Sequence, residues 1–352
     1  MTEPLPLLRV RWQLQFTKCS LKCPYCIAEW TRRPVDFNPE LFNAIIDRLL
    51  EQPYRLVLRL GVEGEIFLSP ELLEGVVRLS RHPKVEGVSF STNLTAGDDE
   101  VTAFLGRADC TKLGMGATIH DTQIDEKGVE GFFRRIEFVQ KRGVLCFVGY
   151  VAKPGRFGRM RACKARSDAL GVPFIPNEYN GALEYQPYPE AYTAREREEL
   201  RDMFWADHYY DMLVERKSPK GRLCLAGHRY IYLGSDGKIL RCGVERNLPW
   251  NLWQKMAWRI HKEWPLKMQQ KRVLRRSLGN ILTDDLELDA TPGPCPHASC
   301  TCGNEVQALH AVGREYHRTR ALRVIYPKAR AAEYEAKYPN LKPVQDDEAS
   351  VE

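Results

Sequence analysis

Residues 17–26 have the sequence TKCSLKCPYC, which sets Cys19, Cys23 and Cys26 in a C-x-x-x-C-x-x-C pattern. This loop directly follows Leu8–Phe16, a strand-like run of mainly apolar residues. Three thiolates at this spacing can bind three irons of a 4Fe–4S cube and leave the fourth iron open. A structural zinc ion is more often closed by four protein ligands. The loop therefore predicts an iron–sulfur site, with a zinc loop as the alternative.

The rest of the N-terminal half alternates between strand-like and helical patterns. The strand-like runs are Leu8–Phe16, Arg55–Leu60, Gly87–Phe90, Lys112–Ile119, Val144–Val151 and Val172–Ile175. The helical stretches include Pro39–Leu50, which Asn38 is placed to cap, Pro70–Leu79, Val129–Lys141 and Arg156–Leu170. Six such βα units with right-handed crossovers predict an α/β fold, a partial (βα)6 TIM-like barrel. Its site is expected at the carboxyl ends of the strands.

The cysteine loop resembles that of the radical S-adenosylmethionine (SAM) superfamily, whose members carry C-x-x-x-C-x-aromatic-C after the first strand of a partial barrel. The resemblance implies that Cys19, Cys23 and Cys26 hold a 4Fe–4S cluster. It implies that SAM chelates the open iron through its amino and carboxylate groups, with Tyr25 beside the adenine. The expected chemistry is reductive cleavage of SAM to a 5′-deoxyadenosyl radical, which abstracts a hydrogen atom from carbon.

Further landmarks of the same family follow in order. The segment GVEGE at residues 61–65 is similar to its Gly-Gly-Glu-Pro motif, with Gly64 and Glu65 at the positions that approach the SAM amino group. The first glycine and the proline of that motif are absent here. Asn93 ends the third strand in a Thr-Asn pair like the family's, and Thr118, at the end of the fourth, is the ribose candidate. Taken singly, each could be an ordinary strand terminus.

A second group of cysteines lies in the C-terminal third. Its members are Cys224, Cys242, Cys295, Cys300 and Cys302. A β-hairpin is expected between the first two, across the turn Ser235-Asp236-Gly237. With Leu278-Gly279-Asn280-Ile281, the group resembles the SPASM/twitch domain. Five cysteines match its shorter twitch form, which implies one auxiliary 4Fe–4S cluster, and zinc is the alternative.

The sequence leaves the complete ligand set of this second site open. The first two cysteines should supply two ligands, and two more must come from Cys295, Cys300 and Cys302, with His297 as a further candidate. One thiol is then left over. If it donates a hydrogen atom to a substrate radical, the enzyme is an epimerase. Otherwise electron transfer to the auxiliary cluster gives a dehydrogenase.

Composition is that of a globular protein of 352 residues, 43% hydrophobic and 28% charged. Eleven cysteines in two main groups favour metal binding in a reducing compartment over disulfides. No signal peptide or membrane span is evident, so a cytoplasmic location is expected. The predicted parts are a barrel (1–180), a helical connection (181–220), the cluster domain (221–305) and a C-terminal part (306–352) with helices at Val306–Arg318 and Ala329–Lys337.

The cluster domain contains a basic, tryptophan-rich insertion at 246–276. It holds nine basic residues against one acid, within a chain of net charge +6. Trp250, Trp253, Ala257, Ile260 and Trp264 follow helical spacing. Three interpretations compete: a helix packed on the barrel, a patch for an anionic substrate, and a surface for nucleic acid or membrane.

Function follows from the family resemblance as far as the reaction type. The expected substrate is small and carbohydrate-like or a natural product, and the alternative is a ribosomally made peptide. A flavodoxin- or ferredoxin-type protein is the expected reductant, and nucleic acid is not an expected partner. An alternative of another class is a non-catalytic metal-cluster protein that binds nucleic acid through the basic insertion.

Overall fold

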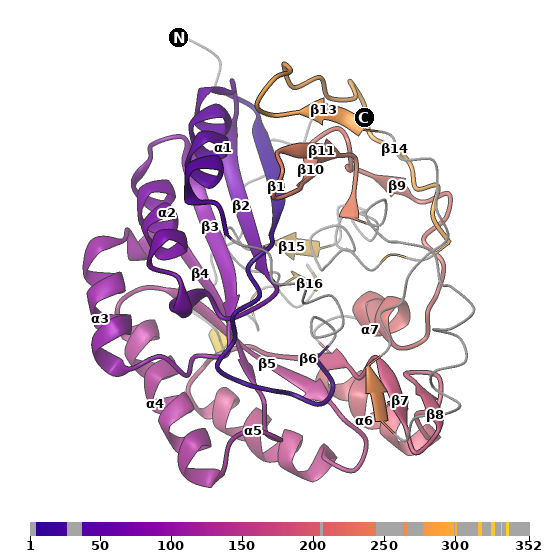
Figure 1. The fold of residues 1–352 in the computed structure, drawn as a ribbon. Helices are drawn as coiled ribbons and strands as arrows, with labels where there is room; N and C mark the ends of the chain where they lie inside the picture. Colours follow the sequence, from indigo (N-terminus) through magenta and orange to yellow (C-terminus); the bar gives the residue numbers. More distant parts are fainter. Residues whose placement is uncertain are drawn as a thin grey trace.

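A nine-stranded, curved sheet dominates this computed structural model (Figure 1). The model describes residues 5–26, 37–204, 207–243, 263–265, 277–298, 300, 316–318, 325–327, 332, 336 and 337. The strand order is β13-β11-β10-β1-β2-β3-β4-β5-β6, and β10 and β1 to β6 are mutually parallel. The six consecutive strands form the predicted partial barrel, which is not closed.

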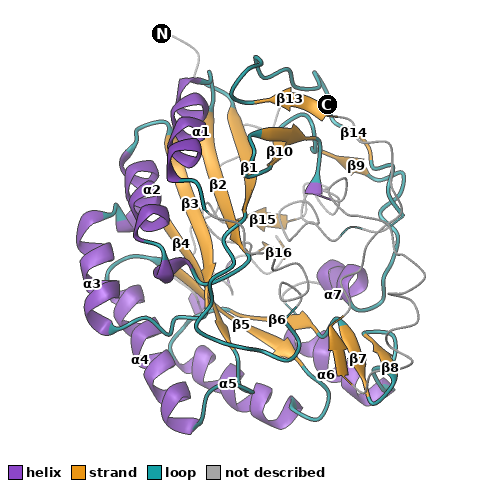
Figure 2. Cartoon of the chain, in the orientation of Figure 1, coloured by secondary structure: helices purple, strands orange, loops and turns teal. Residues whose placement is uncertain are grey.

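The strands and helices of the barrel alternate along the chain. The strands are β1 (Leu7–Leu14), β2 (Arg55–Val62), β3 (Val85–Thr92), β4 (Leu113–Ile119), β5 (Leu145–Ala152) and β6 (Phe174–Glu178). The helices are α1 (Pro39–Glu51), α2 (Pro70–Arg81), α3 (Asp98–Arg107), α4 (Glu126–Lys141) and α5 (Phe157–Ala169). Figure 2 shows these helices along the outer side of the sheet.

Local sequence explains where these elements begin. Asn38 caps α1 by accepting a hydrogen bond from the Leu41 amide, and Pro39 occupies the first turn, as predicted.

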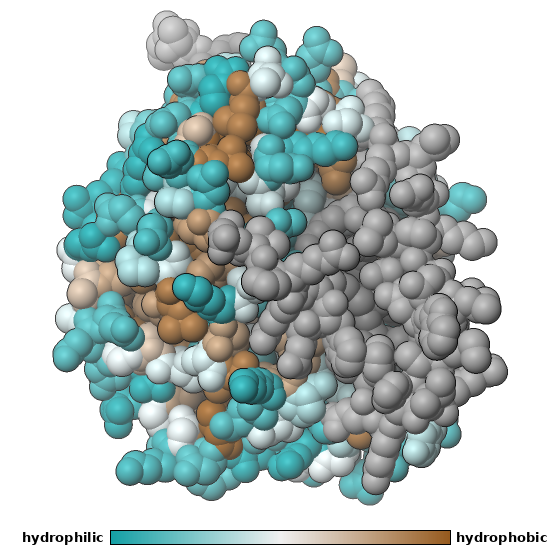
Figure 3. All heavy atoms as spheres, in the orientation of Figure 1, coloured by the Kyte–Doolittle hydropathy of each residue, from teal (hydrophilic) through white to brown (hydrophobic). Residues whose placement is uncertain are grey.

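On β1, Trp12 stacks on Phe42 of α1 at 4.9 Å between ring centroids. Alternate residues of a strand point to opposite faces, so Arg11 and its neighbours at even spacing face the inside of the barrel. In Figure 3 hydrophilic side chains prevail on the outer helical side, as amphipathic helices require.

The C-terminal part extends the same sheet. Strand β10 (Tyr230–Leu233) pairs parallel with β1, and β11 (Lys238–Leu240) returns antiparallel to it. Gly237 has φ +79° in the turn between them, a conformation that suits glycine. This is the predicted hairpin, and β13 (Ser277–Asn280) pairs with β11. A separate three-stranded sheet has β7 (Gly181–Leu183) between β8 (Gln186–Tyr188) and β12 (Glu263–Pro265). Two further sheets have two strands each: β9 (Leu223–Cys224) with β14 (Gly293–Pro294), and β15 (Tyr316–Arg318) with β16 (Ile325–Pro327).

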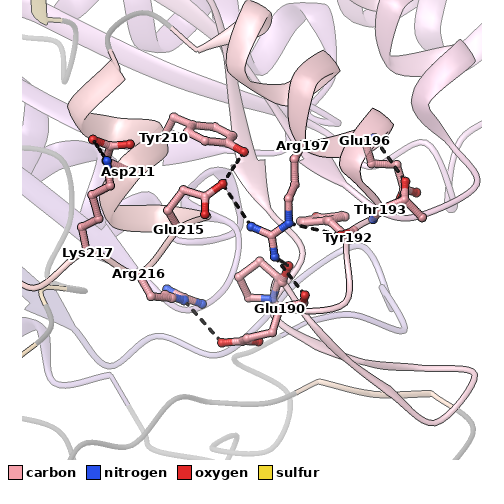
Figure 4. Close-up of polar contacts among 11 residues, drawn as sticks. Glu190, Tyr192, Thr193, Glu196, Arg197, Tyr210, Asp211, Glu215, Arg216 and Lys217 are labelled. Atoms are coloured by element: carbon pink, nitrogen blue, oxygen red, sulfur yellow. Dashed lines mark hydrogen bonds and ion pairs between the residues drawn. The ribbon is translucent and has the colours of Figure 1, made fainter.

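A polar network fixes the chain between the barrel and the second cysteine group (Figure 4). It joins α6 (Ala194–Met203) to the end of α7 (Asp207–Leu213). Glu215 accepts the Tyr210 hydroxyl at 2.7 Å and pairs with Arg197 at 3.1 Å. Arg216 lies 3.7 Å from Glu178 at the end of β6. These contacts hold the segment that leads back to β9.

Three predicted helical segments differ from the structure. Trp264 lies in strand β12, paired with Ala182, so the helix predicted from tryptophan spacing does not extend to it, and positions 246–262 and 266–276 lie outside the described residues. The helix predicted at Val306–Arg318 is wrong for Tyr316–Arg318, which pair with Ile325–Pro327, and its remainder is not described. The connection at 181–220 begins with the β7–β8 hairpin before its two helices. Positions 332, 336 and 337 are helical, as predicted.

Within the described ranges, every helix is too short or too polar to cross a lipid bilayer.

Candidate functional site

The cysteine loop, here called the cluster loop (residues 17–26), follows β1 at the carboxyl edge of the sheet. Its backbone is fastened to the end of β2, because the amide of Glu65 donates to the Lys18 carbonyl at 2.8 Å. Gly64 packs directly on Lys18, and a Cβ atom at Gly64 would overlap the Lys18 carbonyl oxygen. Glycine is therefore required at this position. Cys23 is buried, and Cys19 and Cys26 are half-buried.

The Glu65 carboxylate links the ends of two strands behind the loop. One of its oxygens accepts the Thr92 hydroxyl at 2.6 Å and the Phe67 amide at 3.2 Å, and the other accepts the Asn93 amide at 2.6 Å. Burial raises the pKa of Glu65, and these hydrogen bonds oppose that shift. Both oxygens of the Glu65 carboxylate thus accept hydrogen bonds from the protein itself and tie β2 to β3. The predicted contact between Glu65 and the SAM amino group stays a prediction.

Asn93 connects Glu65 to the cluster loop, because its backbone amide bonds to Glu65 and its side chain bonds to Ser20. Its side-chain amide donates to the Ser20 hydroxyl at 3.0 Å and lies 3.7 Å from the sulfur of Cys19. Its carbonyl oxygen accepts from the amide and hydroxyl of Thr95 at 3.0 and 2.7 Å, which fixes the orientation of the side chain. The structure thus brings Asn93 to the first cysteine, and its predicted place beside SAM stays a prediction.

Tyr25 is held by a residue that sequence reasoning did not single out. Its hydroxyl lies 3.2 Å from Nδ1 of His120, and the two rings are stacked at 6.0 Å between centroids. Burial lowers the pKa of His120 to about 4, so the imidazole is neutral at pH 7. Burial also raises the pKa of Tyr25, so its phenol stays protonated. His120 directly follows β4, and its place at a strand end is the signal by which the sequence could have identified it.

The inner face of the barrel carries polar and cationic groups on its first strands. Arg11 of β1 is in register with Arg59 of β2, and Arg59 donates to the Ser91 hydroxyl of β3. Gly61 leaves room for Arg11, since a Cβ atom there would lie 2.9 Å from its guanidinium. Thr118, the ribose candidate, is half-buried on β4. The alternation in LLRVRWQL, residues 7–14, contained the signal for the inward arginines.

The second cysteine group converges on one buried place. Cys224, Cys242, Cys295 and Cys300 pack together with Met212, Ala226 and Tyr230. Strand pairing explains the convergence, because β14 sets Gly293 opposite Cys224 and so brings Cys295 beside it. Cys302 lies outside the described residues. Tyr230 begins β10 opposite Arg9, near the start of β1, so this site and the cluster loop lie toward opposite ends of the parallel strands.

Two of these sulfurs have a nitrogen within hydrogen-bond distance. The Ala226 amide donates to Cys224 at 3.4 Å, and Nε2 of His297 lies 3.4 Å from Cys242. Burial raises the pKa of Cys224 to about 12 and also raises that of Cys295. Buried thiols of this kind become thiolates only when a cation takes up their charge, as a metal centre does.

Ligand spacing and donor type distinguish a cluster site from a site for a single ion. In the described part of the chain, no three His, Cys, Asp or Glu side chains converge tightly enough to hold one metal ion. A 4Fe–4S cube binds each thiolate through a different iron, so its ligands stand farther apart than those of one zinc ion. The all-sulfur donor set of the cluster loop matches iron–sulfur chemistry.

Residues 15–159 match a family model described as the radical SAM superfamily. This segment is a radical SAM domain. Domains of this family use a 4Fe–4S cluster and SAM. The chain resembles a solved structure of native anSMEcpe with bound AdoMet, at 18% identity and a TM-score of 0.50, over 79% of each chain. Another structure of that protein, with AdoMet and the Kp18Cys peptide, gives 18% identity and a TM-score of 0.51, again over 79% of each chain.

A structure of SuiB from Streptococcus suis is also similar, at 12% identity and a TM-score of 0.47, over 70% of this chain and 63% of SuiB. At 18% identity the resemblance to anSMEcpe concerns the fold alone. Comparison with curated proteins gave no match.

Proposed function

We propose that this protein is a radical SAM enzyme that removes a hydrogen atom from carbon and carries a second, auxiliary 4Fe–4S cluster in a twitch-type domain. The observation that carries the proposal is the cluster loop. Cys19, Cys23 and Cys26 extend from the carboxyl end of β1, and the backbone beneath them is fastened by Gly64 and Glu65. With a reduced cluster and SAM bound, the site supplies a 5′-deoxyadenosyl radical to the substrate.

The residues around the loop have separate roles in this proposal. Asn93 holds Cys19 and the adjacent serine through its amide. Tyr25, fixed by His120, presents a neutral aromatic ring beside the adenine, and Thr118 offers a hydroxyl to the ribose. Neutral groups suit this place, because a charged side chain would attract water into a site that must exclude side reactions.

The auxiliary cluster is proposed from the four cysteines that meet beside β10. Since they lie toward the end of the strands opposite the cluster loop, a substrate on the inner face would lie between the two sites. The substrate could then pass an electron to the auxiliary cluster, as in a dehydrogenase, or receive a hydrogen atom from a leftover thiol, as in an epimerase. Turnover in deuterium oxide separates the two, because only inversion by a thiol places a solvent deuteron on carbon.

A small carbohydrate-like or natural-product substrate remains the first candidate. A peptide is the second, and one observation favours it: the anSMEcpe structure with the same fold holds the Kp18Cys peptide. The half-buried Arg11 on the inner face favours a substrate of either class that bears an anionic group.

Anaerobic reconstitution followed by dithionite and SAM tests the proposal. The expected result is about eight irons per chain and formation of 5′-deoxyadenosine. Replacing the three cluster-loop cysteines by alanine should leave about four irons and abolish SAM cleavage. Absence of 5′-deoxyadenosine from the reconstituted parent would favour a non-catalytic metal protein. Zinc in the triple variant would refute the auxiliary iron–sulfur cluster.

A further inference from the structure

His297 is buried at the second cysteine group, with 2% of its surface exposed. Its Nε2 atom lies 3.4 Å from the sulfur of Cys242, the distance of an N–H···S hydrogen bond. Its backbone amide donates to Cys295, two residues earlier. One residue therefore contacts two of the sulfurs, one through its side chain and one through its backbone.

The other ring nitrogen points to a specific role. Nδ1 of His297 is buried and has no hydrogen-bond partner among the residues that the structure describes. Burial of a polar atom without a hydrogen bond is unfavourable, because the atom loses its contact with water and gains nothing in return. A purely structural position would be filled at lower cost by an apolar residue of similar size. A histidine at this buried position is explained if its Nε2–H group donates a hydrogen bond to the sulfur of Cys242.

The charge at this site explains what that donor does. A 4Fe–4S cluster held by four thiolates is negatively charged, and reduction adds one more negative charge. Hydrogen bonds to the sulfurs stabilise the reduced state more than the oxidised state, which raises the reduction potential. Arg241, also buried here and 3.8 Å from Asp289, adds a cation whose field opposes the raised pKa of Cys224.

We propose that His297 is a positioning residue of the auxiliary cluster. Its Nε2–H group donates to the Cys242 thiolate, and this hydrogen bond makes the cluster easier to reduce. This inference rests on the proposed auxiliary cluster. It assigns His297 outside the set of iron ligands, because ligands on different irons of one cube stand farther apart than 3.4 Å, whereas a donor and its sulfur acceptor meet at this distance.

Two substitutions separate the hydrogen bond from the bulk of the ring. His297→Gln keeps a side-chain N–H of similar reach, and His297→Leu removes it. Both are made in the full chain, in the background that lacks the three cluster-loop cysteines, so that only the auxiliary cluster remains. His228→Leu is the control, because that ring bonds to the backbone oxygen of Asp289 at 2.6 Å in the same domain.

The readouts are iron content and a redox titration followed by electron paramagnetic resonance. All variants should retain about four irons. At the potential where the background protein is half reduced, His297→Leu should show an about tenfold lower ratio of reduced to oxidised cluster, or about 59 mV for one electron. His297→Gln and His228→Leu should stay near the background value.

Other results overturn the inference. An unchanged potential in His297→Leu with full iron content would show that the hydrogen bond has no effect. Loss of iron in both His297 variants, with strong nitrogen hyperfine coupling in the background protein, would make His297 a ligand instead. If the background protein itself binds no iron, the auxiliary cluster of the proposed function has failed, and His297 loses this role with it.

Discussion

Replacing Gly64 by alanine should disrupt the first cluster site more than any other glycine change nearby. The new Cβ would overlap the Lys18 carbonyl oxygen and lie 2.8 Å from its carbonyl carbon and 3.0 Å from its nitrogen. All three are backbone atoms, so no side chain can rotate away. The cluster loop must move, and the bond from the Glu65 amide to Lys18 is lost with it.

The cost can be worked from these contacts. Overpacking against a fixed backbone costs about 1–3 kcal/mol, and the lost hydrogen bond adds about 1 kcal/mol. If the total of about 2–4 kcal/mol falls on the cluster loop, the loop geometry that binds iron is disfavoured roughly 30- to 1000-fold. Iron should therefore drop from about eight to about four per chain after reconstitution, and SAM cleavage should be lost.

Gly106 supplies the matched control. It lies in helix α3 with nothing within 4 Å of a built Cβ, so Gly106→Ala should stabilise the protein by about 0.4–1 kcal/mol and leave the iron content unchanged. The assay is iron content together with thermal unfolding of both variants. Full iron content and SAM cleavage in Gly64→Ala would refute the close packing of Gly64 on the loop.

Three further changes test the rest of the site. Thr118→Val should weaken SAM binding about 3- to 10-fold in equilibrium dialysis with unchanged iron, and equal affinity would remove Thr118 from the ribose site. Glu65→Gln replaces one carboxylate oxygen by an NH2 group that faces the Thr92 hydroxyl or the Asn93 amide, both of which are donors. The free energy of unfolding measured with urea should fall by about 2 kcal/mol. An unchanged free energy of unfolding would contradict the hydrogen-bond network. Burial lowers the pKa of His120 from 6.5 to about 4, so the unfolded chain takes up this proton at a higher pH than the folded chain does. The free energy of unfolding should therefore fall as the pH drops from 6.5 to 4, by at most about 3 kcal/mol. His120→Asn should flatten that part of the pH profile, and an equally steep profile in the variant would exclude His120 as its source.

The barrel could be predicted because its signals are local. Each buried parallel strand is a short apolar run, and the caps that begin its helices lie next to them in sequence, as at Asn38 and Pro39. The cluster loop was recognised in the same way, since its three cysteines span only eight residues. Such features need no knowledge of what packs against them.

The parts that were missed depend on pairing between distant residues. Trp264 has helical spacing with its neighbours, but it lies in a strand because it pairs with Ala182, far earlier in the chain. The contact of His120 with Tyr25 joins the end of β4 to the cluster loop, and that of His297 with Cys242 spans 55 residues. The sequence marked Tyr25 and His297 as candidates but not His120, and only the fold supplied the partners.

The pairing of β10 with β1 has a consequence for how the chain is made. More than 200 residues separate Leu14 from Tyr230, so β1 leaves the ribosome long before the strand that covers its free edge. At about 5–20 residues per second, that edge stays open for roughly 10–40 s. Exposed strand edges recruit other chains, so a nascent copy is most prone to aggregation during this interval. Binding of a chaperone, or of the first cluster, to the N-terminal half would be most valuable before residue 230 is synthesised.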